Sequence, residues 1–164
     1  MARARPIPDL VADDPYTVAA ARIVAVRARE VADHAHDVLD VAEIEHLHDM
    51  RVATRRLRAA LEIFEPCFPP KELGAALTQL KAIADALGER RDRDVTIAAL
   101  EDFEAAMPAP DRPGVETLVE RLRAEQGEAN ETLAAFIDPG QLATLSGLLG
   151  ELVAAAEDAR DTAA

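Results

Sequence analysis

The stretch HDMRVATRRLRAALEIF, residues 48–64, decides the fold and raises the functional question. Its core-forming residues are spaced seven, four and three positions apart, which is typical of a helix with one buried face. They are Met50, Leu57, Leu61 and Phe64. We therefore expect a helix over about residues 43 to 65, which the prolines of PCFPP at 66–70 would end.

Helical spacing of apolar residues continues on both sides of this stretch. Hydrophobic residues make up 49% of the 164 residues but aromatic ones only 3%, so Ala, Leu and Val must form the core, and these suit close-packed helices. Gly88 looks like a cap or kink between two helices. The other helices are expected over about 15–41, 71–87, 89–106, 115–137 and 139–159. The sequence thus predicts an all-α, antiparallel bundle of about five to six helices.

The chain length and the positions of proline and glycine predict a single domain. We expect a flexible N-terminus over residues 1–13, a helical domain over 14–160 and a frayed tail over 161–164. No apolar run approaches the roughly 20 residues of a membrane span, so we expect no membrane association. The single cysteine, Cys67, fits a cytoplasmic protein.

The arginines of residues 48–64 stand out because the chain is acidic, with a formal net charge of -13. On a helix each residue advances by about 100°. With His48 at 0°, three arginines lie within about 80° of it, beside the apolar face, and Arg56 lies apart near 80° on the other side. The three are Arg51, Arg55 and Arg58.

No acid occurs from residue 50 to residue 61, so no neighbour one turn away neutralises this arginine row. The guanidiniums repel one another unless a polyanion or an acidic partner supplies the negative charge. The planar guanidinium can hold two phosphate oxygens at once, and a charged histidine donates from either ring nitrogen. The row therefore indicates a phosphate-rich ligand.

A second basic cluster, LKAIADALGERRDRDV, covers residues 80–95. It contains Lys81, Arg90, Arg91 and Arg93. In the alternative interpretation these bases form local salt bridges with Asp92 and Asp94, which contribute little to stability at a surface.

In their order and spacing, the two blocks resemble the first half of a CHAD domain, the conserved histidine α-helical domain. That family binds inorganic polyphosphate in a basic channel between helical bundles. The sequence of this chain shows no set of nucleophile, base and orienting residue, so we expect a binding protein without catalytic activity. The resemblance implies phosphate contacts from the first block at His48, Arg51, Arg55, Arg56 and Arg58. From the second block it implies Lys81 and Arg91, and less directly Arg90. It implies no cofactor, and it suggests association with polyphosphate granules.

The chain departs from the family pattern in its second half. A complete CHAD domain resembles two halves, each with a histidine-bearing basic helix, whereas this chain has no histidine after His48. Residues 98–164 hold four Lys and Arg against fourteen Asp and Glu. We therefore expect a homodimer, in which a second copy places its arginine row opposite the first and a polyanion between them favours the pair.

Other functions fit the same residues less well. The arginine row could instead meet an acidic protein partner, which makes the chain an interaction module. His48 with Asp49 is similar to metal-dependent phosphohydrolases, and Glu43-x-x-His46 has the spacing of di-iron bundles, but both need further ligands. Nucleic acid is disfavoured because the chain has one Tyr and no Trp for stacking on bases.

Overall fold

The computed structural model describes residues 3–162, with the side chains of residues 3–159. It confirms the all-α class and contains five α-helices within these residues. They are α1 (Tyr16–His34), α2 (Ile44–Ile63), α3 (Pro70–Ala105), α4 (Pro113–Phe136) and α5 (Pro139–Thr162). Two 3-10 turns, η1 (Glu65–Cys67) and η2 (Ala109–Asp111), connect α2 to α3 and α3 to α4.

Proline marks where three of the helices begin. Pro70, Pro113 and Pro139 are the first residues of α3, α4 and α5. Proline suits this position because its fixed φ matches the helix and its missing N–H would have no partner in the first turn. The Asp138 side chain adds a cap to α5, since it accepts hydrogen bonds from the backbone N–H groups of Gly140 and Gln141.

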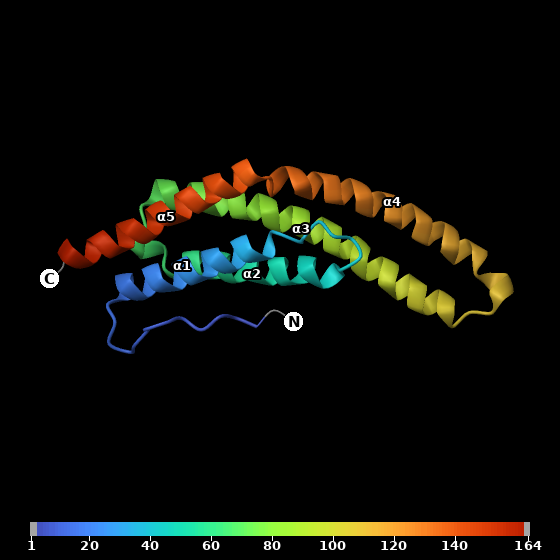
Figure 1. Ribbon diagram of the computed structural model, residues 1–164, viewed down its shortest axis with the longest axis horizontal. Coiled ribbons are helices and arrows are strands. Elements are labelled where there is room, and N and C mark those ends of the chain that lie inside the picture. Colours follow the sequence, from blue (N-terminus) through green and yellow to red (C-terminus); the bar gives the residue numbers. More distant parts are fainter. Residues whose placement is uncertain (1–2, 163–164) are drawn as a thin grey trace.

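The molecule is elongated, and its two ends differ (Figure 1). At one end α1, α2, α5 and the first half of α3 pack together; α1, α2 and α3 run antiparallel in turn, and α5 continues in the direction of α4. At the other end, the second half of α3 continues beside α4 as a two-helix hairpin. With 36 residues, α3 is about 54 Å long and connects both ends.

The main apolar core lies in the four-helix end. Its fully buried side chains come from all four helices there, and α4 joins it only through its last turn and the residue that follows. They include Val24, Leu57, Leu61, Leu80, Leu87 and Leu152. The hairpin leaves large apolar side chains such as Val95, Phe103 and Leu118 about half exposed. The four-helix end is therefore the more closely packed part of the fold, and α2 lies within it.

The structure corrects two predicted boundaries. The first helix ends at His34 rather than near residue 41. In the connection that follows, the side chain of Val38 is buried and that of Ala42 is exposed. Gly88 neither caps nor kinks a helix, because α3 continues through it. The buried positions of α3 continue across the glycine at steps of three and four: 80, 83, 87, 90, 94 and 97. This continuous packing outweighs the local preference of glycine.

The N-terminal segment lies along α1. The backbone N–H of Arg5 donates to Glu30 at 2.6 Å, Arg27 donates to the Arg5 carbonyl at 2.9 Å, and Arg22 pairs with Asp14 at 2.8 Å. Residues 1–2 lie outside the described residues. Of the expected frayed tail, residues 161–162 continue α5, and residues 163–164 lie outside the described part.

None of the helices in the described chain has the length and apolar character that a bilayer crossing requires.

Candidate functional site

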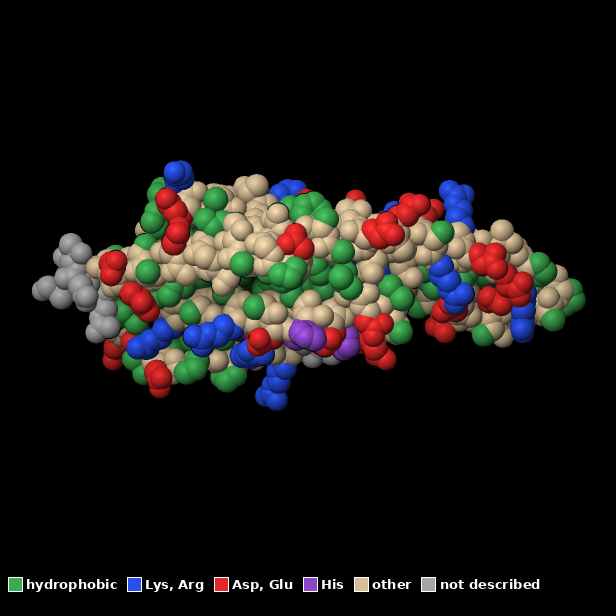
Figure 2. Space-filling model, turned by 45° about the horizontal axis from the view of Figure 1, so that its top comes forward, with side chains coloured by type: hydrophobic (Ala, Val, Ile, Leu, Met, Phe, Trp, Pro, Cys, Tyr) green, Lys and Arg blue, Asp and Glu red, His purple; other side chains and the backbone are tan. Residues whose placement is uncertain are grey.

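Helix α2 places the arginine row on one exposed face. Arg51, Arg55 and Arg58 are exposed and His48 is half-buried. Within the described part of the chain, Arg51 and Arg55 make no hydrogen bond or ion pair, whereas Arg58 pairs with Glu62 at 3.2 Å. Two guanidiniums are therefore available to a ligand. Figure 2 views the molecule from a side on which few charged side chains lie across the middle of the four-helix end, while basic and acidic side chains gather along its edges.

These arginines form one wall of a groove between α2 and α3. The groove has a volume of about 240 Å³. Helix α2 contributes Arg51, Thr54, Arg55 and Arg58, and helix α3 contributes Ala84 and Asp85. Thr54 is 1% exposed, and no described group forms a hydrogen bond with its hydroxyl oxygen, Oγ1. Such a buried hydroxyl normally has a partner, so its place beside three arginines favours an anionic ligand.

Two bases of α3 lie near opposite ends of this row. Lys81 pairs through its Nζ with Asp85, a groove residue, at 2.6 Å. The Arg91 Nη1 donates to the Ile44 carbonyl at 3.3 Å, one turn before His48 on α2. Because α2 and α3 run in opposite directions, the two sequence blocks come together as one basic surface.

Arg90 is predicted as a phosphate contact, but the structure places it away from the surface. It is completely buried, and its Nε donates to the equally buried carboxylate of Asp94 at 2.8 Å. Its Nη1 donates to Asn130 of α4, whose Nδ2 donates to the Leu39 carbonyl. Arg90 therefore joins α3, α4 and the connection between α1 and α2, and its guanidinium does not reach the surface where a phosphate chain would lie.

Arg56 also lies away from the groove. It is half-buried on the side of α2 that faces α1, as its angle of about 80° on the helix indicates. Burial acts to raise the pKa of Glu30 on α1, but the hydrogen bonds from Arg27 and the Arg5 backbone, together with the charges of Arg27 and Arg56, lower it overall. Arg56 therefore acts on a buried acid between helices.

Sequence reasoning missed two groove residues, Thr54 and Asp85. A signal existed for Thr54, since its angle of about 240° puts it between the arginine row and the buried face of the same helix. Asp85 lies four residues after Lys81, which predicts the ion pair but not its place in the groove. That place depends on the register between α2 and α3.

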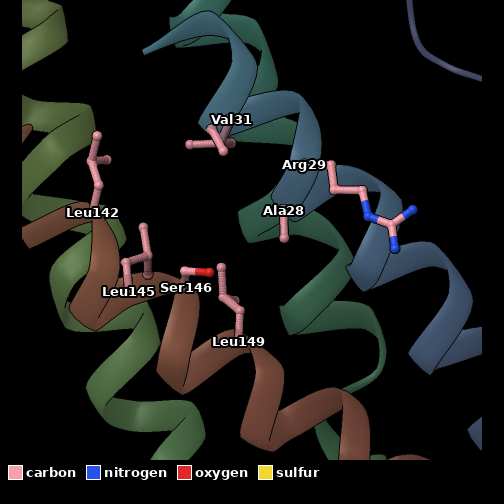
Figure 3. Close-up of a pocket in the computed structure, with 8 residues that line it drawn as sticks. Ala28, Arg29, Val31, Leu142, Leu145, Ser146 and Leu149 are labelled. Atoms are coloured by element: carbon pink, nitrogen blue, oxygen red, sulfur yellow. The ribbon is translucent and has the colours of Figure 1, made fainter. Parts of the chain in front are cut away.

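A second hollow lies between α1 and α5 and differs in chemistry (Figure 3). Its lining is mainly apolar, with Val31, Leu142, Leu145 and Leu149 around a volume of about 120 Å³. The side chain of Arg29 points away from these leucines. Among the described side chains, no three His, Cys, Asp or Glu groups come together to hold a metal ion. The groove between α2 and α3 is therefore the candidate site.

Comparison with known families identifies the CHAD domain. The model of the CHAD domain matches residues 22–164, nearly the whole chain, and this range includes both basic sequence blocks. No curated protein matches the chain.

Proposed function

The chain belongs to the CHAD domain family, and from this premise we propose that it binds inorganic polyphosphate in the groove between α2 and α3. The family is associated with the binding of polyphosphate or triphosphate. The observation that carries the proposal is the pair of exposed arginines, Arg51 and Arg55, with no internal partner in the described chain. In a protein of net charge -13, two exposed arginines without a counter-charge among the described residues favour an external anion.

The groove residues have complementary parts in this proposal. Arg51 and Arg55 each grip phosphate oxygens with their planar guanidinium groups, and Arg58 extends the row by one turn. Thr54 donates its hydroxyl to a phosphate oxygen at the base of the groove. Lys81 and His48 add charge at either end. Arg51 and Arg58 are about 10 Å apart along the helix axis, so a chain of phosphates contacts several bases at once.

We infer that the site binds without catalysing a reaction. Hydrolysis of a phosphate chain needs a base or metal ion that directs water at a phosphorus atom. Among the described residues that line the groove, Asp85 is the single acid, and the other polar lining groups, three guanidiniums and a hydroxyl, are donors suited to holding an anion. We therefore propose a binding protein.

Calorimetric titration at low salt tests the proposal with four ligands: long-chain polyphosphate, monophosphate, single-stranded DNA and poly-glutamate, the polymers matched in charge. Polyphosphate should bind most tightly, and monophosphate far more weakly because it engages few bases at once. Absence of polyphosphate binding, or no advantage over monophosphate, overturns the proposal. Tighter binding of poly-glutamate would identify a protein-interaction surface, and tighter binding of DNA a nucleic-acid surface.

A further inference from the structure

Asp85 is an acid in a groove of bases. It lines the groove together with Arg51, Arg55 and Arg58, and 63% of its side chain is exposed. An anion in this groove is repelled by the Asp85 carboxylate at short range. A groove that only needed to attract phosphate would be better without this acid, so Asp85 requires an explanation.

The explanation lies in Lys81, the ion-pair partner of Asp85. The Lys81 Nζ lies 2.6 Å from the carboxylate, one turn away on the same face of α3. Lys81 is 68% exposed, so its long side chain has room to turn elsewhere. In the structure its ammonium is directed at Asp85, and Lys81 itself is not among the residues that line the groove. The acid therefore holds a base beside the ligand site.

On the α2 wall of the groove, none of the described bases forms an ion pair with an acid that lines the groove. Arg58 also pairs with an acid of its own helix, Glu62, at 3.2 Å, but Glu62 does not line the groove. Arg51 and Arg55 have no partner within the described chain. Asp85 alone, among the groove-lining residues, combines a negative charge inside the groove with a hold on a base at its edge.

We propose that Asp85 is an internal competitor of the ligand, which pairs with Lys81 until a phosphate chain replaces the carboxylate as the partner of the ammonium. This inference rests on the proposed function of the groove. An exposed ion pair of this kind is weak, so a phosphate chain held by Arg51 and Arg55 can exchange it. A single phosphate bound at those two arginines leaves the pair intact. Asp85 thereby lowers affinity and favours ligands long enough to reach Lys81.

The first test removes the carboxylate by Asp85→Asn. Polyphosphate should bind about three- to tenfold more tightly at 0.1 M salt, because a like charge is lost and Lys81 is released. Monophosphate affinity should rise less. Asp102→Asn is the matched control, since Asp102 is exposed on the same helix, about 25 Å away and beyond the Debye length. If Asp85→Asn binds polyphosphate no better than Asp102→Asn, the inference is wrong.

The second test asks whether Asp85 acts through Lys81. In a Lys81→Met background, Asp85→Asn should give less than half of the gain in binding free energy that it gives in the wild-type background. An equal gain in both backgrounds contradicts the proposed exchange and leaves charge repulsion alone. The thermal midpoint of each variant checks folding. If the wild type itself binds no polyphosphate, the proposed function fails, whereas a wild type that binds with no effect of Asp85→Asn defeats only this inference.

Discussion

Arg55 and Arg90 carry the same charged group on neighbouring helices, yet the fold uses them in opposite ways. Arg55 is exposed and has no hydrogen bond or ion pair within the described residues. Arg90 is completely buried and is held by Asp94 and Asn130. The number of internal partners therefore separates an arginine whose guanidinium is available to a ligand from one that holds helices together.

Desolvation explains the difference. A guanidinium taken out of water needs a buried counter-charge and hydrogen bonds, and Asp94 and Asn130 provide them for Arg90. Gln126 of α4 donates a further hydrogen bond to Asp94 at 2.7 Å. At a surface, water solvates the guanidinium, so Arg55 stays unpaired at little expense to folding. It keeps its hydrogen-bonding capacity for an external anion.

The largest effect is expected from Arg90→Met. It leaves the buried Asp94 carboxylate without its counter-charge and should destabilise the fold by about 3–5 kcal/mol in urea denaturation. Polyphosphate affinity per folded molecule should be unchanged. Asp94→Leu added to Arg90→Met should restore much of the loss, because no buried charge then remains. A loss below about 1 kcal/mol would show that Arg90 does not hold the helices together.

Arg55→Ala should have the reverse effect. Binding of polyphosphate should weaken by about 1.5–3 kcal/mol through the lost charge-assisted contact. The thermal midpoint should stay the same or rise slightly, because repulsion within the row is relieved.

Arg56→Ala is the matched control for Arg55→Ala, since it removes the same charge one residue away, on the side of α2 toward α1. It should weaken polyphosphate binding by less than about threefold, because the charge it removes is not in the groove. Equal loss of binding in the two variants would mean that net charge, not the groove, holds the ligand. A large loss of stability in Arg55→Ala would make the row a structural network.

Thr54→Val tests the base of the groove with a side chain of nearly the same shape. Loss of the hydroxyl should weaken polyphosphate binding by about 0.5–1.5 kcal/mol, the usual contribution of one hydrogen bond. Stability should be unchanged or higher, because the hydroxyl is buried without a partner in the described chain. Unchanged binding in calorimetry would remove Thr54 from the site.

The smallest effect concerns Glu30, the buried acid near Arg56. Its pKa is lowered in the folded protein, so its ionised form stabilises the fold above the ordinary pKa of about 4.3. This stability is lost as the pH falls through the lowered value. At pH 7 the wild type should be more stable than Glu30→Gln in urea denaturation, and the difference should shrink below about pH 4.3. A difference that does not change with pH would contradict the lowered pKa.

The sequence predicted what local periodicity controls. The helical class followed from apolar spacing, and the angle of about 100° per residue separated the arginine row from Arg56. Family resemblance alone groups Arg56 with the row. The same angles placed Thr54 beside the row, so this residue was within reach of sequence reasoning.

Residues whose roles depend on distant packing were not predictable in this way. Arg90 lies next to Arg91 in the sequence, and its burial depends on Asn130, 40 residues later, on a helix whose docking has no local signature. The local sequence predicts a cap or kink at Gly88, but the buried positions on both sides of it keep α3 continuous. Asp85 required the register between α2 and α3, which sequence periodicity does not specify.

The dependence of polyphosphate affinity on salt tests the central claim most directly. Each phosphate contact made by a base releases counterions and adds about 0.7 to 0.9 to the slope of log affinity against log salt. Arg51→Ala with Arg55→Ala should therefore lower the wild-type slope by about 1.4 to 1.8, while the thermal midpoint stays near that of the wild type. An unchanged slope would contradict the account, because it would mean that these two unpartnered arginines do not contact the ligand.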